Sequence, residues 1–550
     1  MTKSSFTQNR AKYQPKLPAL LKKAGLQIEA KAVVKTTKSV ANSAEIKKLF
    51  PHIYGKPTLT FVKAKKASKK ALNVGVVLSG GQAPGGHNVV SGILDGIKAS
   101  SPKSNLIGFL GGPSGLIENK FVNLTPAFVK DYRNTGGFDI IGSGRTKLET
   151  EEQFASALST MQAHKLDALV IVGGDDSNTN ACMLAEYIAA KGSPINVIGV
   201  PKTIDGDLKN SEIGASFGFD TASKVYSELV GNICRDANSA KKYWHFIKLM
   251  GRSASHITLE VALQTQPNLT FISEEIAEKK MTLDQVVKTI TDTIVRRSEM
   301  KKNFGVIVIP EGLIEFIPEV KKLIAELNDL LAGKDDFANL GMDDKLQFVN
   351  KNISASSAKV FSSLPMLIKS QLLMDRDPHG NVQVSRIETD KLLIDLVGDA
   401  LRELKQAGKY KGKFSALSHF FGYEGRCASP SNFDADYCYG LGFNAAALVS
   451  VGANGYMSTL KNLAAPAEKW VPGGVPLTMM MNMEHRHGKD KPVIKKALVD
   501  LKGKPFKALA AKRNEWAVTE SYQDPGAIQY WGPSAVCDAT TKTLALEQKK

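Results

Sequence analysis

Two acidic loops constrain the fold most strongly, because each follows a short apolar run typical of a buried strand. The runs are residues 166–172 and 195–200, and the loops are 173–177 (GGDDS) and 201–207 (PKTIDGD). Loops at the carboxyl ends of parallel strands meet in one crevice of an open α/β sheet. We therefore expect the two loops to converge on a single site.

The charges in these loops indicate a metal-assisted reaction on phosphate. Carboxylates beside an anionic ligand repel it, by about 4 kcal/mol for unit charges roughly 4 Å apart at an effective dielectric near 20. Magnesium held between a carboxylate and phosphate oxygens removes that repulsion. In a chain with glycine-rich anion-binding segments, the loops predict magnesium-assisted phosphoryl transfer.

A glycine-rich turn lies between another predicted strand, at 73–79, and a helix from Val89. The turn, 80–88 (GGQAPGGHN), presents backbone N–H groups and a helix N-terminus, which together favour an anion. A plain strand-to-helix turn is the alternative. Further strands at 105–110, 245–250 and 304–309, with helices such as 179–190 and 440–451, predict βαβ units and a mainly parallel sheet.

The length of 550 residues predicts more than one core. We expect an α/β protein with two Rossmann-like parallel-sheet domains and helices on both faces. The phosphoryl-donor domain is placed at 73–220, completed by about 427–480, and the acceptor domain at 221–426. Charged, helix-rich residues from about 320 to 411 predict an inserted helical subdomain. Residues 1–72 are expected as a basic N-terminal extension and 481–550 as a C-terminal segment.

The distribution of charge decides how the net charge of +18 is interpreted. Residues 1–70 hold 17 Lys and Arg against 2 Asp and Glu, so the rest of the chain is nearly neutral. Nucleic-acid binding needs basic residues spread over a folded face, so no nucleic-acid partner is expected. We expect residues 1–70 to be a solvated extension or a surface layer, with a weak polyanion-binding arm as the alternative.

Other features favour a cytoplasmic location. No apolar run approaches the ~20 residues of a membrane helix, and the basic N-terminus lacks an apolar signal core. The five cysteines are odd in number and have no CxxC spacing, which favours a reducing interior over disulfides or a zinc site. We expect no membrane partner.

Seven short motifs occur in one order along the chain. They are GGQAPGGHN (80–88), GSGR (142–145), GGDDS (173–177), PKTIDGD (201–207), MGR (250–252), PEG (310–312) and YEGR (423–426). The set resembles the phosphofructokinase family, specifically its long pyrophosphate-dependent branch, from about residue 73 to 450. A Walker-type P-loop and a GxGxxG after a strand are both missing.

The resemblance implies donor-side roles. It places Gly81 and Arg145 at the phosphoryl donor, and it makes Asp175 the Mg²⁺ ligand, directly or through water. Asp176 or Ser177 could cap a helix that starts near residue 178 while Asp175 binds the metal. ATP-dependent relatives typically have Gly at positions 176 and 202, so the carboxylate and amine here imply pyrophosphate as donor. Those relatives also usually have Asp at position 82, where this chain has Gln.

Catalytic roles follow from the same resemblance. Asp205 is expected as the general base that takes the proton of a sugar hydroxyl as it attacks phosphorus, with support from Asp207. Lys202 is expected as the transition-state cation, and Arg252 supports the same charge. A simple turn built on Asp-Gly-Asp is the alternative for this loop.

The acceptor implied by the resemblance is fructose 6-phosphate. Arg426, which suits bidentate phosphate binding, and Tyr423 are placed on its 6-phosphate, and Glu311 on a sugar hydroxyl. Lys242 and Tyr243 stand where the family brings contacts from a neighbouring subunit, which implies a homodimer or higher homo-oligomer with the acceptor site at the interface. The remaining acceptor positions are Thr203, Ile204, Asp207, Met250 and Gly251.

The implied reaction is reversible, Mg²⁺-dependent transfer of a phosphoryl group from pyrophosphate to O1 of fructose 6-phosphate. The products, fructose 1,6-bisphosphate and phosphate, belong to glycolysis and gluconeogenesis. An ATP-dependent 6-phosphofructokinase and a non-catalytic regulatory subunit are the alternatives. The presence of Asp175, Lys202, Asp205 and Arg252 argues against the regulatory subunit.

Overall fold

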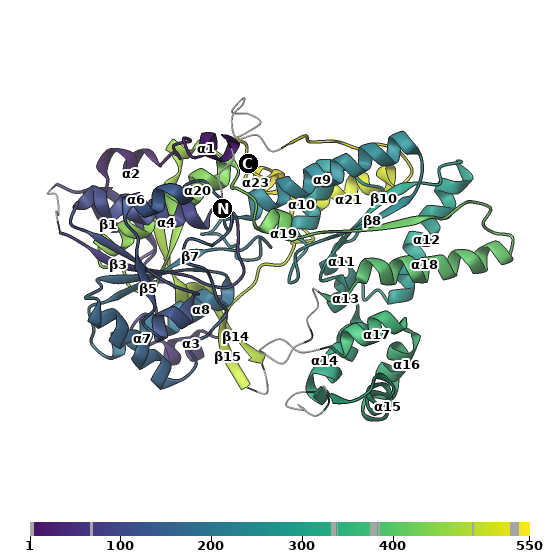
Figure 1. The fold of residues 1–550 in the computed structure, drawn as a ribbon, viewed down its shortest axis with the longest axis horizontal. Helices are drawn as coiled ribbons and strands as arrows, with labels where there is room; N and C mark the ends of the chain where they lie inside the picture. Colours follow the sequence, from purple (N-terminus) through teal and green to yellow (C-terminus); the bar gives the residue numbers. More distant parts are fainter. Residues whose placement is uncertain are drawn as a thin grey trace.

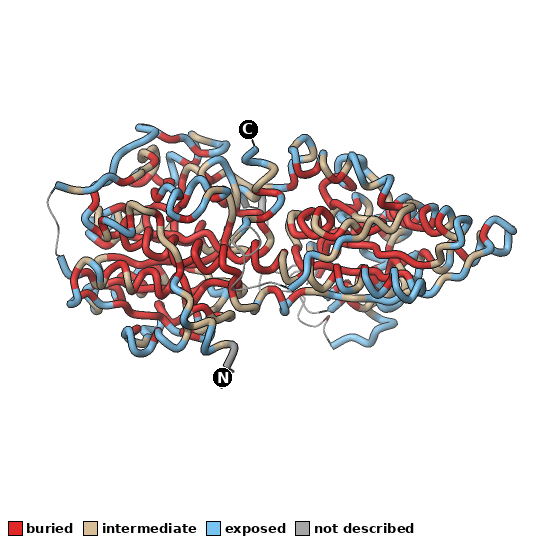
Figure 2. The backbone as a smooth tube through the Cα atoms, turned by 90° about the horizontal axis from the view of Figure 1, so that it is seen from above, coloured by how far each residue is buried: buried red, intermediate tan, exposed pale blue. Residues whose placement is uncertain are grey.

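Runs of Val, Ile and Leu form the buried strands of two sheets, one in each lobe of the molecule (Figure 1). The computed structural model describes residues 5–65, 70–331, 337, 339–374, 382, 386–486, 489–527 and 538–549. Figure 2 shows a buried interior in each lobe, with exposed segments around it. The predicted α/β class with parallel sheets is confirmed.

The first lobe contains a nine-stranded sheet in the order β1-β2-β13-β12-β7-β6-β3-β4-β5. Its five central strands are parallel: β12 (Tyr456–Lys461), β7 (Asn196–Pro201), β6 (Ala168–Gly173), β3 (Asn73–Leu78) and β4 (Asn105–Phe109). Antiparallel strands complete the edges: β5 (Phe121–Asn123), β13 (Val471–Pro476), β2 (Leu59–Lys63) and β1 (Ile28–Ala32).

Alternate side chains of these strands enter two different cores, so helices cover both faces of the sheet. Val76 and Val170 join the core of α4 (Gly86–Ser100) and α20 (Asn432–Ser450). Val77 and Ile171 join the core of α7 (Glu151–Ala163) and α8 (Asp175–Ala190). Helix α20 comes from beyond the second lobe and packs along α4, so the chain returns to the first lobe.

The N-terminal segment is part of this lobe: for its described residues the expected solvated extension is wrong, and the segment instead forms an outer layer anchored by a few buried side chains. Strands β1 and β2 extend the sheet. Leu21 and Phe61 are buried in the α4–α20 core, and Ile46 and Phe50 in the α8 core. Edge strands and short helices need few apolar residues to cover one face, so the lysines on the exposed face dominate the composition.

The second lobe contains a four-stranded parallel sheet in the order β11-β8-β10-β9. The strands are β11 (Ala416–Phe421), β8 (Trp244–Leu249), β10 (Gly305–Pro310) and β9 (Leu269–Thr270). Helices α9 (Phe219–Ala240) and α10 (His256–Thr265) share one core with it, and α12 (Leu283–Glu299) and α18 (Thr389–Gln406) share another.

A group of helices projects from this lobe (Figure 1). It consists of α14 (Pro318–Leu331), α15 (Met342–Asn352), α16 (Ala355–Ser363) and α17 (Met366–Leu372). Helix α18 also falls within the span expected as an insertion, but it packs against β8 and β11 of the sheet. The residue boundaries given above for the domains stay predictions.

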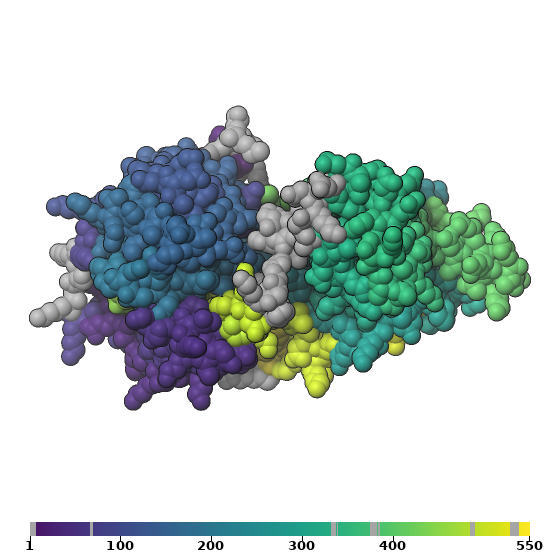
Figure 3. Space-filling model, turned by 90° about the horizontal axis from the view of Figure 1, so that it is seen from below, coloured from purple at the N-terminus to yellow at the C-terminus, as the bar shows by residue number. Residues whose placement is uncertain are grey.

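The C-terminal residues form a hairpin, β14 (Met481–Arg486) with β15 (Lys489–Ile494), and helices α21 (Lys504–Trp516) and α23 (Lys542–Gln548). Both helices pack on α10. The yellow atoms of this segment lie between the two lobes in Figure 3. The remaining short elements are α1 (Ser5–Arg10), α2 (Ala19–Ala24), α3 (Ser43–Leu49), α5 (Pro113–Ile117), α6 (Pro126–Val129), α11 (Ser273–Glu278), α13 (Leu313–Phe316), α19 (Tyr423–Arg426), η1 (Lys130–Tyr132), η4 (Ala467–Lys469) and η5 (Leu477–Met480).

Candidate active site

The two acidic loops lie side by side, because they follow the neighbouring strands β6 and β7. The backbone N–H of Lys202 donates to the carbonyl of Gly173 (2.9 Å), which fixes one loop on the other. The loop after β3 joins them through Ser177 Oγ, which donates to Ser79 Oγ (2.8 Å). Three consecutive strand ends therefore form one edge of the site, as the strand pattern predicted.

Helix α8 begins at the first carboxylate of its loop. Asp175 and Asp176 stand in the first helical turn, Gly174 is the N-cap, and no side chain caps the helix. The expectation that Asp176 or Ser177 caps a helix starting near residue 178 is therefore wrong. Negatively charged side chains in a first turn interact favourably with the positive end of the helix without a capping role.

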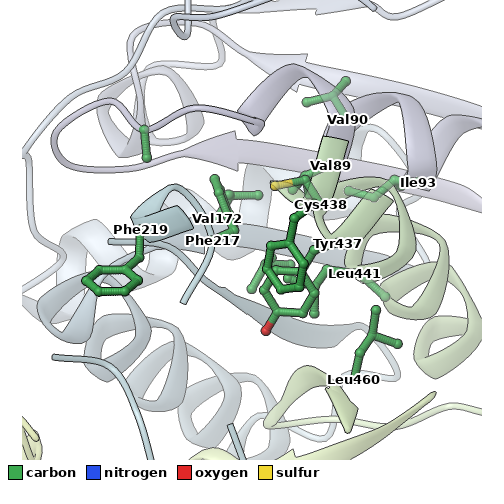
Figure 4. Close-up of a cluster of buried hydrophobic side chains, with 14 of the residues drawn as sticks. Val89, Val90, Ile93, Val172, Phe217, Phe219, Tyr437, Cys438, Leu441 and Leu460 are labelled. Carbon is green, nitrogen blue, oxygen red and sulfur yellow. The ribbon is translucent and has the colours of Figure 1, made fainter. Parts of the chain in front are cut away.

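The glycines after β3 serve two purposes. Gly85 has φ +99°, and a Cβ there would lie 2.2 Å from Cys438 Sγ; at Gly86 a Cβ would lie 2.1 Å from a Phe138 ring carbon. Figure 4 shows Cys438 beside Val89 in this packed region, where α4 and α20 meet. Gly85 and Gly86 are thus needed for close packing within the core.

Gly80 and Gly81 face charged groups of the site. A Cβ at Gly80 would lie 3.3 Å from Lys202 Nζ, and a Cβ at Gly81 would lie 3.2 Å from Arg426 Cζ. Arg426 belongs to α19, beyond the sheet of the second lobe. The glycine loop therefore lies beside cations from both halves of the site, which suits the close approach of a phosphate.

Lys202 carries the central positive charge. Its side chain is buried, and its pKa falls to about 8 because burial and the nearby Arg426 disfavour the ammonium, whereas Asp205, Asp175 and Asp207 favour it. At neutral pH the amine is still largely protonated. It is a positioned cation in a buried region, where charge interactions are stronger than in water.

Asp205 and Asp207 differ in their exposure. Asp207 is 4% exposed, and burial followed by the charges of Asp205 and Asp175 raises its pKa to about 7, against an opposing effect of Lys496. Asp205 is only partly buried, and its backbone N–H donates to Thr203 Oγ1 (3.1 Å). Of the two carboxylates, Asp205 is the one with access to a substrate.

The second lobe supplies Glu311 and Arg426. Glu311 follows β10, is 3% exposed, and accepts the backbone N–H of Gly251 (2.9 Å). Burial raises the pKa of Glu311, and the charge of Asp205 raises it further. Arg426 Nε is buried and has no hydrogen-bond acceptor among the described residues. Tyr226 holds the start of α19, because its hydroxyl donates to the carbonyl of Gly422, the residue that precedes this helix.

Three predicted site residues either pair with another side chain or are exposed to solvent. Arg252 forms a bidentate ion pair with Glu315, at 3.2 and 3.1 Å. Arg145 is exposed, and Tyr423 is 65% exposed with its ring 6.0 Å from Arg426 Cζ. Ile204 and Met250 are buried beneath the site, the latter with its N–H on the Phe421 carbonyl.

Lys242 and Tyr243 lie at the opposite end of β8 from Met250. Both are exposed, and six residues of strand separate them from the site, a distance of about 20 Å. They cannot contact the same sugar phosphate as Arg426 within one chain. Their predicted role therefore requires a second subunit.

Sequence reasoning missed two lysines. Lys147 forms an ion pair with Asp176 (3.3 Å), and Lys496 forms one with Asp175 (3.5 Å). Lys147 lies two residues after the GSGR motif (142–145), and this closeness to a motif could have marked it as a site residue. Lys496 lies in a C-terminal segment without any motif, and no sequence signal indicated that it reaches the acidic loops.

The fold and this site define an α/β phosphotransferase, with an anion loop, a buried cation and an accessible carboxylate at the carboxyl ends of parallel strands. The sequence profile of the family Phosphofructokinase matches residues 73–361. The chain belongs to the phosphofructokinase family.

The similarity to two relatives covers the whole length of this chain. It is 55% identical over 550 residues to "Pyrophosphate--fructose 6-phosphate 1-phosphotransferase" of Porphyromonas gingivalis, covering 100% of both chains. It is 54% identical to the protein of that name from Treponema pallidum, covering 100% of this chain and 98% of the relative. A pyrophosphate-dependent phosphofructokinase structure from Marinobacter aquaeolei shares the fold, with TM-score 0.52 and 16% identity over 82% of this chain and 93% of the other.

The structure bears on two further features, the cysteines and the length of the apolar helices. The described cysteines Cys182, Cys234, Cys427 and Cys438 are all unpaired, and Cys537 lies outside the described residues. Within the described ranges, every helix falls short of the length and apolarity that a bilayer crossing requires.

Proposed function

We propose that the protein transfers a phosphoryl group reversibly from pyrophosphate to O1 of fructose 6-phosphate. The observation that carries this proposal is the meeting of Lys202, Asp205 and Arg426 beside the Gly80–Gly81 loop. The names of full-length relatives at 54–55% identity support the same reaction. Fructose 1,6-bisphosphate and inorganic phosphate are the products.

The site residues divide the chemistry between them. Asp205 takes the proton of the sugar hydroxyl as the oxygen attacks phosphorus. Lys202, already fixed and charged, stabilises the charge on the moving phosphoryl group without further reorganisation. Arg426 binds the sugar phosphate, whose oxygens satisfy a guanidinium that lacks a full set of acceptors. Glu311, held by Gly251, orients a sugar hydroxyl.

Arg252 is proposed to support the same transferring charge. This role requires the guanidinium to exchange its bidentate contact with Glu315 for phosphate oxygens. The exchange conserves the geometry of the contact, since carboxylate and phosphate both accept two parallel N–H bonds. Arg145, on the exposed loop after the GSG motif, is proposed to contact the donor.

Magnesium is proposed as the cofactor, held by Asp175. The described residues contain no cluster of three His, Cys, Asp or Glu side chains suited to a closed metal site, whereas Mg²⁺ uses one or two carboxylates and completes its shell with phosphate oxygens. The crowding of Asp175, Asp205 and Asp207 fits a divalent cation: burial raises the pKa of Asp207, and the charges of Asp205 and Asp175 raise it further. When bound, the ion neutralises donor oxygens.

Pyrophosphate is favoured over ATP by the side chains at the donor end. Lys202 lies beside Gly80, and Asp176, paired with Lys147, places a side chain where ATP-dependent relatives typically have glycine. The regulatory-subunit alternative predicts lost catalytic residues, but Lys202, Asp205 and Arg426 form a continuous site. A catalytic, pyrophosphate-dependent enzyme therefore accounts best for the residues present.

A homodimer or higher homo-oligomer is proposed because Lys242 and Tyr243 are exposed at the far end of β8. In such an assembly they complete the acceptor site of a neighbouring subunit. A cytoplasmic location is proposed on the unpaired thiols of the described chain, which suit a reducing compartment.

The proposed function is tested with purified protein, Mg²⁺ and fructose 6-phosphate, with either pyrophosphate or ATP as donor. Formation of fructose 1,6-bisphosphate is followed with each. We expect rapid turnover with pyrophosphate and poor turnover with ATP. Asp205→Asn keeps the shape of the side chain but removes the base, and serves as the matched control. Comparable rates with both donors would overturn the donor assignment, and full activity of Asp205→Asn would overturn the site.

A further inference from the structure

A short C-terminal stretch, residues 494–499, crosses from one lobe to the other at the site; it is called the crossing segment below. On the first lobe, the N–H of Ile494 donates to Thr179 Oγ1 of α8 (3.0 Å). The N–H of Ala497 donates to the carbonyl of Asp207 (2.7 Å). The crossing segment is therefore fixed to the helix that carries Asp175 and to the loop that carries Asp205.

The same segment is fixed to the second lobe. The Ala497 carbonyl bonds to the Nε2 of His256 (2.8 Å), at the start of α10. The N–H of Val499 donates to the buried carboxylate of Glu274 (2.9 Å). Since residues on both sides of position 496 are held by hydrogen bonds, the backbone there has a defined position.

The side chain of Lys496 extends from the crossing segment toward Asp175, at the start of α8. Its Nζ donates to Ser253 Oγ (2.8 Å) and lies 3.5 Å from Asp175 Oδ2. The amine is thus a positioned cation, held by one hydrogen bond and one ion pair.

Lys202 and Lys496 approach Asp175 from different segments of the chain: Lys202 is buried, whereas the side chain of Lys496 is 33% exposed. Lys202 lies next to the glycine loop and Arg426, on the side of the sugar phosphate. Lys496 is instead held by Ser253 and lies 3.5 Å from Asp175, at the start of α8. A pyrophosphate between the glycine loop and α8 would place one phosphate toward Lys202 and the other toward Lys496.

We infer that Lys496 binds the phosphate of pyrophosphate that is released as inorganic phosphate, an inference that rests on the proposed function. An ammonium offers three N–H donors; one is held by Ser253, and the contact with Asp175 can be exchanged for a phosphate oxygen. Lysine acts on phosphate as a compact point charge. The crossing segment thereby makes the donor site depend on contacts with both lobes.

The test compares Lys496→Met, which keeps the alkyl stem but removes the charge, with Lys495→Met at the adjacent exposed position. For Lys496→Met we expect the KM for pyrophosphate to rise roughly 10- to 100-fold, the effect of losing a charged hydrogen bond. In the reverse reaction the KM for inorganic phosphate should rise similarly. The KM values for both sugar phosphates should change less than about twofold, and Lys496→Arg should recover much of the loss.

Several outcomes would overturn the inference. One is an unchanged KM for pyrophosphate and phosphate in Lys496→Met, and another is an equal change in Lys495→Met. A rise confined to the sugar phosphates would place Lys496 on the acceptor. Lys496→Gln removes the charge but keeps a donor for Ser253, and its KM values are measured in the same way. If Lys496→Met fails to fold, the KM values of Lys496→Gln decide the question.

Binding without turnover separates this inference from the proposed function. Calorimetric titration of magnesium pyrophosphate, without sugar phosphate, into the wild type, Lys496→Met and Lys495→Met reports donor binding alone. Weaker binding in Lys496→Met only supports the inference, and equal binding in all three refutes it. If the wild type gives no turnover with pyrophosphate, the proposed function fails while this comparison still decides the role of Lys496.

Discussion

Replacing Gly81 by Ala tests whether the glycine loop and the sugar-phosphate arginine form one site. A Cβ at position 81 would lie 3.2 Å from both Cζ and Nη1 of Arg426, and 3.4 Å from Nη2. Gly81 is not among the glycines with positive φ, so alanine adds no backbone strain there. The substitution therefore acts on the guanidinium.

The size of the effect follows from these distances. Nonbonded atoms settle at about 3.5–4.0 Å, so the guanidinium must retreat by a few tenths of an ångström. A retreat of that size degrades a charged hydrogen bond, which contributes about 1.5–3 kcal/mol. Because about 1.4 kcal/mol corresponds to tenfold, we expect the KM for fructose 6-phosphate to rise roughly 10- to 100-fold. Turnover at saturation should fall much less.

Initial rates with each substrate varied in turn measure the effect. Gly398→Ala is the matched control, since its Cβ would meet only a Phe414 ring carbon at 3.9 Å. In an Arg426→Met background, Gly81→Ala should have little further effect, because the two changes act on one contact. A raised KM for pyrophosphate alone, or full additivity with Arg426→Met, would refute the reasoning.

Three further predictions concern the base, the donor and the fold. Asp205→Ser should lower turnover by about 10²–10⁴-fold with little change in fructose 6-phosphate binding by calorimetry; turnover near wild type would move the base to Asp207. Asp176→Gly should raise ATP-supported kcat/KM while pyrophosphate remains usable, and no gain in a folded variant would show that donor choice is set elsewhere. Phe61→Ala, at the buried position of strand β2 in the N-terminal segment, should lower the free energy of unfolding by about 3–5 kcal/mol in urea denaturation, whereas a loss below about 0.5 kcal/mol, typical of surface positions, would mean that the segment is not part of the core.

The central strands could be predicted because their apolar runs are continuous. The sequence patterns for β3, β6, β7, β8 and β10 differ from the observed strands only at their ends. Strands buried on both faces are apolar throughout, so a continuous apolar run is enough to locate them in the sequence. Since loops follow such strands directly, the positions of Asp175, Lys202, Asp205 and Glu311 at strand ends could also be predicted.

The remainder depends on tertiary contacts that local patterns do not contain. Strands β1 and β2 are exposed on much of their surface, so their lysines obscured the few buried positions. Lys496 reaches Asp175 from 321 positions further along the chain, through hydrogen bonds of the crossing segment to both lobes. The ion pair of Arg252 with Glu315 likewise depends on how α13 follows β10. None of these contacts has a sequence period or spacing.

The most direct test of phosphoryl transfer to and from pyrophosphate is the reverse reaction. Purified protein is mixed with Mg²⁺, fructose 1,6-bisphosphate and inorganic phosphate, and phosphorus NMR follows the products. The site described here predicts that pyrophosphate and fructose 6-phosphate appear in equal amounts, and that Asp205→Asn abolishes both. Formation of ATP when ADP is supplied, with no pyrophosphate formed from phosphate, would contradict it.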